Sequence, residues 1–208
     1  MLDRLARRII DPVLDRVAAR LVRARIGADV LTWIGFGLGV AAIASVAAGV
    51  YLAGLALFLA NRIADGLDGA VARHTRPSDL GGFLDIVLDF IVYAGMVFGF
   101  ALADPAANAL AAAFLLFAFM GTGASFLGFA VMAAKRGLAT DRRGRKSLYY
   151  LGGLTEGTET ILFVVLACLL ADRFALLAGI FAGLCWVTTV ARVATAHQLL
   201  RERVARAS

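Results

Sequence analysis

The order of apolar and polar positions divides the chain into a short amphipathic segment and a series of long apolar runs. Within residues 1–25, apolar side chains recur every three or four positions and arginines lie between them. This spacing places the apolar side chains on one face of a helix. An arginine-rich helix of this kind lies in the headgroup plane of a bilayer, and we expect an N-terminal amphipathic interfacial helix here. A solvated helix packed on a partner is the alternative.

Six apolar runs follow this segment. Their approximate bounds are 30–50, 52–73, 81–102, 106–134, 157–171 and 174–198. A membrane-spanning helix takes about 20 apolar residues, so six such helices would use roughly 120 residues and form one compact bundle. We therefore expect an all-α integral membrane protein in which residues 26–200 form six transmembrane helices. Residues 201–208 form a basic tail, and no separate soluble domain fits the length.

Composition supports this interpretation. Of the 208 residues, 61% are hydrophobic, and the mean hydropathy is +0.83. A soluble domain of this length has too much surface to be covered by so few polar residues. The net charge of +6 comes from arginine blocks between apolar runs, which suit an anionic membrane leaflet and phosphate-bearing substrates. Because no stacking platform or recognition motif accompanies them, we expect no nucleic-acid partner.

The distribution of Lys and Arg predicts the topology. Seven precede the first run, two lie in the 73–80 connection, six lie in the 135–147 loop, and three lie in the tail, whereas the alternate connections hold only Arg173. Since basic residues concentrate on the cytoplasmic side, both termini are expected in the cytoplasm. The expected location is a bacterial inner membrane.

Four acidic residues interrupt the second and third runs. They are Asp65, Asp68, Asp85 and Asp89, within 25 residues of otherwise mostly apolar sequence. Each carboxylate near a bilayer centre costs about 2.5–3.5 kcal/mol, so four unpaired ones would cost on the order of 10 kcal/mol. They must therefore lie near an interface, in a polar cavity, and be neutralised.

The spacing of these acids indicates how they are neutralised. The first two are three residues apart and the second two are four residues apart, so each pair projects from one face of its helix. The two helices run antiparallel, and both pairs fall near the cytoplasmic ends, where they can face each other. Four facing carboxylates would repel one another, and two divalent cations would remove that repulsion. Arg62 and Arg73 are further candidates for neutralising the cluster, but neither can bridge four acids alone.

Glycines lie beside the acids. Gly66, Gly69, Gly81 and Gly82 occupy the same helix ends. Missing side chains would allow a nucleotide base to lie against the backbone. Close packing of membrane helices is the alternative for any one of them.

These residues form a recognisable signature. The chain reads Asp65-Gly-Leu-Asp68-Gly69-Ala-Val-Ala72-Arg73 and then Gly81-Gly-Phe-Leu-Asp85-Ile-Val-Leu-Asp89. This resembles the CDP-alcohol phosphotransferase family, whose motif is D-x-x-D-G-x-x-A-R followed by G-x-x-x-D-x-x-x-D. All specified positions match, although the seven residues between Arg73 and Gly81 are fewer than usual. Leu31-Thr32 and Gly35 also resemble the family's opening of the first span.

The resemblance implies a role for each matching position. Asp65, Asp68 and Asp85 would bind two divalent metal ions, Mg²⁺ or Mn²⁺. Asp89 would contact a metal and serve as the general base. The cytidine would pack against Gly69, Ala72 and Gly81, and Arg73 would hold the diphosphate. The family also implies six spans, a cytoplasmic active site and a homodimer.

The acceptor side is open to two interpretations. Lys135, Arg136, Arg142, Arg143 and Arg145 could bind an acceptor phosphate, or they could simply follow the positive-inside rule. Arg192, within the sixth run, is expected to bind that phosphate, and snorkelling to the interface is its alternative. Glu156 and Glu159 are either ordinary acids at a helix N-terminus or groups that orient the acceptor.

The resemblance implies a phospholipid-synthesising enzyme. It would transfer the phosphatidyl group of CDP-diacylglycerol to a small alcohol such as glycerol 3-phosphate, or next inositol phosphate, and release CMP. A second possibility is transfer from a soluble CDP-alcohol to diacylglycerol. Outside enzymes, a divalent-cation transporter or a metal-binding structural protein would also account for acids within the membrane.

Overall fold

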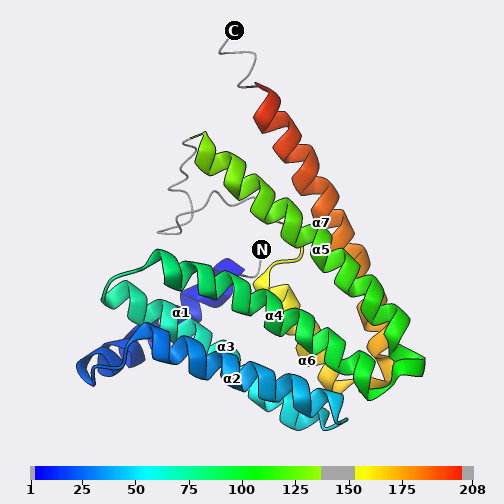
Figure 1. Ribbon diagram of the computed structural model, residues 1–208, viewed down its shortest axis with the longest axis horizontal. Coiled ribbons are helices and arrows are strands. Elements are labelled where there is room, and N and C mark those ends of the chain that lie inside the picture. The colour runs from blue at the N-terminus through cyan, green and yellow to red at the C-terminus, as the bar shows by residue number, and fades with distance from the viewer. Residues whose placement is uncertain (1–2, 137–152, 203–208) are drawn as a thin grey trace.

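The computed structural model describes residues 3–136 and 153–202, and these residues form helices and short connections. The helices are α1 (Asp3–Arg23), α2 (Ala28–Ala47), α3 (Tyr51–His74), α4 (Asp79–Ala103), α5 (Pro105–Lys135), α6 (Gly157–Leu169), the 3₁₀ turn η2 (Ala171–Arg173) and α7 (Phe174–Glu202) (Figure 1). The all-α prediction is therefore confirmed for the described part of the chain.

Four helices of the described residues are long and apolar enough to cross a membrane. They are α2, α4, α5 and the stretch Ala171–Arg201, which joins η2 to α7. By contrast, α6 has only 13 residues, and α3 carries several charged side chains in its C-terminal half. Six α-helices follow α1, at the positions of the six apolar runs. Only four of the described helices meet the criteria of length and composition for a membrane span. Spanning by α3 and α6 remains a prediction.

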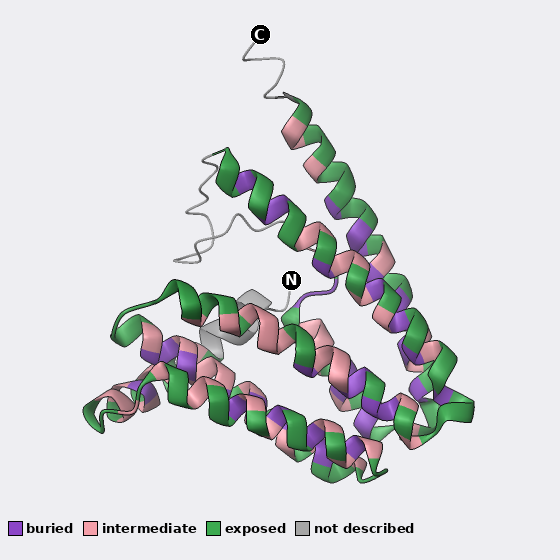
Figure 2. Ribbon diagram, viewed as in Figure 1, coloured by how far each residue is buried: buried purple, intermediate pink, exposed green. Residues whose placement is uncertain are grey.

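Many positions on these helices are exposed (Figure 2), and large apolar residues occupy many of them. Trp33 on α2, Phe98 on α4, Phe117 on α5 and Val190 on α7 are each more than half exposed. Soluble monomers rarely expose apolar surface on this scale, because it would drive association in water. The chain is accordingly an integral membrane protein.

Local sequence signals set the helix boundaries. The Ser78 hydroxyl accepts a hydrogen bond from the Gly81 amide and caps α4. Asp104 caps α5 in the same way, and Pro105 occupies the first turn, where its missing N–H costs nothing. Gly49 takes a positive φ of 78° between α2 and α3, a conformation that costs glycine little. The helices from α2 to α5 are thus joined by connections of only a few residues.

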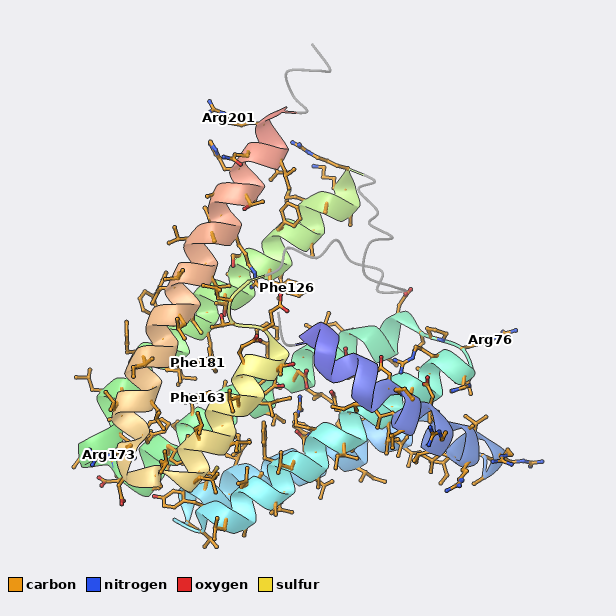
Figure 3. The ribbon with its side chains drawn as sticks, turned by 180° about the vertical axis from the view of Figure 1, so that it is seen from behind. Arg76, Phe126, Phe163, Arg173, Phe181 and Arg201 are labelled. Atoms are coloured by element: carbon orange, nitrogen blue, oxygen red, sulfur yellow. The ribbon has the colours of Figure 1, made fainter. Side chains whose placement is uncertain are left out.

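The helices form two groups. In Figure 1, α2, α3 and α4 lie side by side, while α5 and α7 pack together and extend beyond them. The groups meet around a buried aromatic core, where Phe100 stacks on Phe174 with ring centroids 4.4 Å apart. Phe163 stacks on Phe181 with centroids 4.8 Å apart (Figure 3). This core fixes α4, and with it one pair of acids, against the rest of the bundle.

Basic side chains lie at the ends of the helix groups. Figure 3 shows Arg173 at the corner where the two helix groups meet, and Arg76 and Arg201 at the far ends of the two groups. This arrangement agrees with a topology in which the 73–80 connection and the C-terminal region share one side of the membrane. The cytoplasmic assignment of that side remains a prediction.

Helix α1 packs on α3 beneath the acidic pair of that helix. Ala18, Ala70 and Val71 are fully buried together, and a Cβ at Gly66 would lie 2.8 Å from Leu14 Cδ1. Residues 3–23 therefore form a helix that packs mainly on α3, and its amphipathic character remains a prediction. Its location in a headgroup plane remains a prediction.

Close approach between α2 and α4 depends on Gly39. A Cβ added there would lie 2.6 Å and 3.2 Å from the two methyl groups of Val92, whose stiff branched side chain cannot easily rotate away. We expect Gly39→Ala to cost about 1–3 kcal/mol of stability through overpacking. The midpoint of thermal unfolding in detergent measures this loss. Gly37→Ala is the matched control, because no atom lies within 4 Å of the added methyl group, and equal midpoints for both variants would contradict the close packing.

Candidate active site and metal centre

The four acids line one pocket between α2, α3 and α4. Asp65 and Asp68 enter it from α3, and Asp85 and Asp89 enter it from α4. Its other lining residues are Thr32, Gly35, Phe36, Asn61, Arg62, Leu88 and Val92. The two acidic pairs thus face each other across one pocket, from neighbouring helices.

Three of the acids converge closely. One carboxylate oxygen from each of Asp65, Asp68 and Asp85 lies within 4.8 Å of the others. Mg²⁺ binds oxygen at about 2.0–2.1 Å and Ca²⁺ at about 2.3–2.6 Å, so ligands on opposite sides of one ion are about 4–5 Å apart. The spacing and the hard oxygen donors therefore fit a divalent cation. These three residues are hereafter the aspartate triad.

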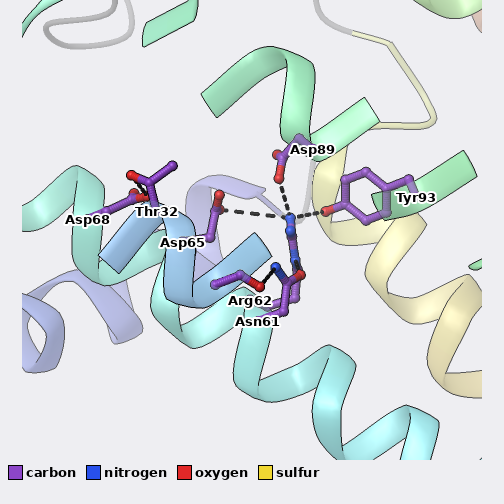
Figure 4. A network of polar contacts seen from close by, with 8 residues as sticks. Thr32, Asn61, Arg62, Asp65, Asp68, Asp89 and Tyr93 are labelled. Carbon is purple, nitrogen blue, oxygen red and sulfur yellow. Dashed lines mark hydrogen bonds and ion pairs between the residues drawn. The ribbon is translucent and has the colours of Figure 1, made fainter. Parts of the chain in front are cut away.

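Asp89 lies beside the aspartate triad and contacts an arginine. Its Oδ1 accepts a hydrogen bond of 2.7 Å from Arg62 Nη1, which is also 3.8 Å from Asp65 Oδ2 (Figure 4). Arg62 additionally donates to the Tyr93 hydroxyl at 3.0 Å and to Asn61 Oδ1 at 2.8 Å. The guanidinium thus bridges the acidic pairs at one side of the pocket and partly neutralises them.

Thr32 on α2 supports the opposite side of the pocket. Its hydroxyl donates to Asp68 Oδ2 at 2.7 Å and is 3.1 Å from the Ala28 carbonyl oxygen (Figure 4). Asp68 is only 7% exposed, so the hydroxyl compensates part of the cost of burying this carboxylate. Helix α2 thereby contributes to the acidic site although it carries none of the four acids.

Comparison with known proteins identifies the family. Residues 25–201 match the family model described as CDP-alcohol phosphatidyltransferase. The chain belongs to the CDP-alcohol phosphatidyltransferase family.

Two relatives and two solved structures are similar to this transferase. Inner membrane protein YnjF of Escherichia coli (strain K12) is 52% identical over 97% of this chain and 98% of its own. Archaetidylinositol phosphate synthase of Methanothermobacter thermautotrophicus is 46% identical over 40% of each chain.

The solved structures are of Mycobacterium tuberculosis phosphatidylinositol phosphate synthase (PgsA1). With CDP-DAG bound, it covers 89% of this chain and 94% of its own, with a TM-score of 0.70 and 22% identity. In complex with manganese and citrate, it covers 88% of each chain, with a TM-score of 0.69 and 22% identity. At this identity the similarity establishes a shared fold.

The other signature positions of this phosphatidyltransferase lie next to the pocket rather than in its lining. Gly69 and Ala72 are in the last turns of α3, and Gly81 is in the first turn of α4. Arg73 is 3.6 Å from Asp15 Oδ1 on α1, which also lies 3.8 Å from His74 Nε2. Arg73 therefore contacts an acid from α1 and not the aspartate triad. Binding of cytidine and diphosphate by these residues remains a prediction.

The expected acceptor residues that the structure describes lie at the end of α5, at the start of α6 and on α7. Arg192 is 7% exposed, donates to the Thr122 carbonyl at 3.2 Å and lies 5.8 Å from the Phe126 ring. This burial between α5 and α7 does not fit snorkelling. Glu156 is buried at the start of α6, and its amide donates to Glu159, so both acids belong to a capping box. Orientation of the acceptor by these acids remains a prediction. Arg142, Arg143 and Arg145 lie outside the described residues.

Three polar residues of the site were not predicted from sequence. Thr32, Asn61 and Tyr93 all lie in apolar runs, and each contacts a charged group of the pocket. For Asn61 and Tyr93 the available signal was polarity within a membrane helix, since such groups seek partners. Thr32 also belongs to the segment that resembles the family's opening of the first span. Neither signal names a partner, and so neither could place these side chains at the acids.

Removing the Thr32 hydroxyl should weaken metal binding. Thr32→Val keeps the branched shape but leaves Asp68 without this donor, and loss of an outer-shell partner typically costs about 10–100-fold in metal affinity. Calorimetric titration of the purified protein with Mn²⁺ measures the change. Thr195→Val is the control, because this exposed threonine on α7 bonds only its own helix backbone at Ala191. An unchanged Mn²⁺ affinity for Thr32→Val would contradict the supporting role.

Proposed function

We propose that this phosphatidyltransferase moves the phosphatidyl group of CDP-diacylglycerol to a small alcohol and releases CMP. The observation that carries the proposal is the aspartate triad with Asp89 beside it in one pocket. Family membership supports the reaction type. The PgsA1 structure with CDP-DAG bound supports this lipid as the donor.

We further propose that Asp65, Asp68, Asp85 and Asp89 hold two divalent ions, Mg²⁺ or Mn²⁺. The spacing of the aspartate triad supports this assignment, as does the PgsA1 structure in complex with manganese and citrate. When bound, such ions stabilise negative charge that develops on phosphate oxygens.

Within this reaction, the protein's residues bind the donor and move one proton. Arg73 and the surface of Gly69, Ala72 and Gly81 bind the diphosphate and cytidine of the donor. The oxygen of the acceptor hydroxyl forms a bond to the phosphorus attached to diacylglycerol. Asp89 accepts the proton that this hydroxyl loses. The bond from that phosphorus to the oxygen of CMP breaks, and CMP leaves with the bonding electrons.

For the acceptor, we propose a small phosphorylated alcohol. Glycerol 3-phosphate and inositol phosphate are the candidates, and the second is supported by the names of the synthases to which the chain is similar. Arg192 is the proposed ligand of the acceptor phosphate, with Arg143 as a second. A buried guanidinium suits this role because its planar donors match phosphate oxygens.

The proposed setting is a bacterial inner membrane, with six spans, both termini and the active site on the cytoplasmic side, and a homodimer as the assembly. Four apolar helices and the name of the Escherichia coli relative support the membrane. The charge distribution of the loops supports the orientation.

The proposal is tested by incubating purified protein with radiolabelled CDP-diacylglycerol and each candidate alcohol. Labelled CMP and a labelled lipid product should form with one phosphorylated alcohol, stop on addition of a chelator, and resume when Mg²⁺ or Mn²⁺ is restored. Product formation that survives chelation would refute the metal-dependent mechanism. Transfer from a soluble CDP-alcohol to diacylglycerol would instead show that the lipid is the acceptor and the soluble CDP-alcohol the donor.

The transporter alternative requires a separate measurement. Proteoliposomes loaded with a Mn²⁺-sensitive dye should show no protein-dependent influx of Mn²⁺. Influx without any release of CMP would favour a transporter over an enzyme.

A further inference from the structure

Arg62 is a buried cation at the acidic pocket to which the proposed reaction assigns no task. Its side chain is 9% exposed, and it lies on α3 one turn before Asp65. A buried guanidinium needs several partners, because desolvation of an unpaired charge is costly. The identity of those partners indicates what Arg62 does.

The guanidinium is fixed from several directions. Nη1 donates to Asp89 Oδ1 at 2.7 Å and to the Tyr93 hydroxyl at 3.0 Å, while Nε donates to Asn61 Oδ1 at 2.8 Å (Figure 4). The group also lies 4.8 Å from the centre of the Tyr93 ring and 5.6 Å from that of Phe58, within the range of cation–π attraction.

Asn61 is itself held in place. Its Nδ2 donates to the backbone carbonyl of Gly35 on α2 at 2.8 Å, and its side chain is buried. The orientation of the guanidinium is therefore set by α2, α3 and α4 together. A chain of contacts runs from the α2 backbone through Asn61 and Arg62 to the carboxylate of Asp89.

This chain of contacts leaves Asp89 with a defined orientation. Arg62 bonds Oδ1, so Oδ2 is the oxygen with which Asp89 can face a hydroxyl or a cation. A general base must lie within hydrogen-bond reach of the proton that it removes. A carboxylate with unrestricted rotation about its side-chain bonds would meet that requirement only part of the time.

Charge alone does not account for an arginine at this position. A lysine ammonium would also offset the charge of Asp65 and Asp89, but it is a point charge without a planar fork. The contacts with Asp89, Tyr93 and Asn61 use two nitrogens of one plane. This geometry favours positioning over simple neutralisation.

We propose that Arg62, fixed by Asn61 and Tyr93, is the positioning residue that orients Asp89 for proton transfer. The inference rests on the proposed function, since it assumes that Asp89 receives the acceptor's proton. Arg62 acts through Asp89 and does not itself contact the reacting atoms.

The test compares Arg62→Lys, Tyr93→Phe and the control Arg173→Lys, with wild-type protein assayed for CMP release. A displacement of about 1 Å can cost about 100-fold in rate, so Arg62→Lys should lower kcat by about that factor. Its KM values for donor and acceptor should stay within about threefold. Tyr93→Phe removes one hydrogen bond to Arg62, and a smaller loss in kcat, on the order of tenfold, is expected. Arg173 is exposed at the corner where the two helix groups meet (Figure 3), and its variant should match wild type.

A second readout does not depend on turnover. Electron paramagnetic resonance of Mn²⁺ added to substrate-free protein should give the same number of bound ions in Arg62→Lys and wild type. The zero-field splitting should differ, because a displaced Asp89 changes the ligand field, and Arg173→Lys should leave it unchanged.

The outcomes separate the two proposals. Active wild type with wild-type kcat in Arg62→Lys and Tyr93→Phe would overturn the positioning role and leave the proposed function standing. A lower kcat with an unchanged Mn²⁺ spectrum would also overturn the positioning role, because the orientation of Asp89 would then be unaltered. A lower kcat with loss of bound Mn²⁺ would overturn it too, because Arg62 would then act on metal binding. Wild type that releases no CMP with any acceptor would overturn the proposed function itself, and the positioning role with it. If Arg62→Lys does not fold, Tyr93→Phe alone decides the matter by the same criteria.

Discussion

Replacing Asp89 with Asn should lower kcat by about 10²–10⁴-fold, the range that general acid–base catalysis contributes. Asn has the same shape, and its amide oxygen can still accept the hydrogen bond that Arg62 gives to Oδ1. The substitution therefore keeps the position of the side chain, removes its capacity to take a proton, and replaces a charged metal ligand by a neutral one. The rate of CMP release at saturating donor and acceptor measures the effect.

The matched control for Asp89→Asn lies at the other end of the same helix. Asp104 ends α4 and caps α5 through the Ala107 amide, and Asn serves equally well as a cap. Asp104→Asn should therefore retain the wild-type rate. If Asp89→Asn also retained it, Asp89 would not be the base.

Replacing Asp85 with Asn should reduce Mn²⁺ affinity by more than about 100-fold, because loss of an outer-shell partner alone costs about 10–100-fold. Asp85 supplies the α4 oxygen of the aspartate triad. The substitution therefore removes one of the three negatively charged groups proposed to hold an ion between α3 and α4. CMP release at fixed Mn²⁺ should fall in parallel. Calorimetric titration with Mn²⁺ measures the affinity directly.

Asp79→Asn is the corresponding control. Asp79 lies in the first turn of α4, is exposed and is not part of the pocket lining. Its variant should bind Mn²⁺ as wild type does. Equal affinities for the Asp79 and Asp85 variants would show that the ions bind elsewhere.

The helices could be predicted from sequence because each apolar run is bounded by polar residues, glycine or proline. The grouping of the acids could also be predicted, because spacings of three and four residues place side chains on one helix face. The number of spans was less accessible. Charged residues in α3 and the short length of α6 leave four helices that satisfy the criteria for a membrane span, and sequence periodicity cannot show how deeply the other two enter lipid.

The detailed pairing within the site depends on how the helices rotate against one another. Sequence spacing placed Asp89 on the same face as Asp85, but it could not show that Asp89 contacts Arg62 while Asp85 joins the α3 pair. Arg62 and Arg73 had equal standing as neutralising groups. The structure separates them, because α1 packs on α3 and places Asp15 beside Arg73. That contact joins residues 58 positions apart, which no local pattern encodes.

The most direct test of the central claim counts the ions held between α3 and α4. Detergent-purified wild-type protein, stripped with a chelator and titrated with Mn²⁺, is followed by the electron paramagnetic resonance signal of the unbound ion. If the facing carboxylates hold a dinuclear centre, binding should saturate at two Mn²⁺ per chain. A titration without saturable binding would contradict the account.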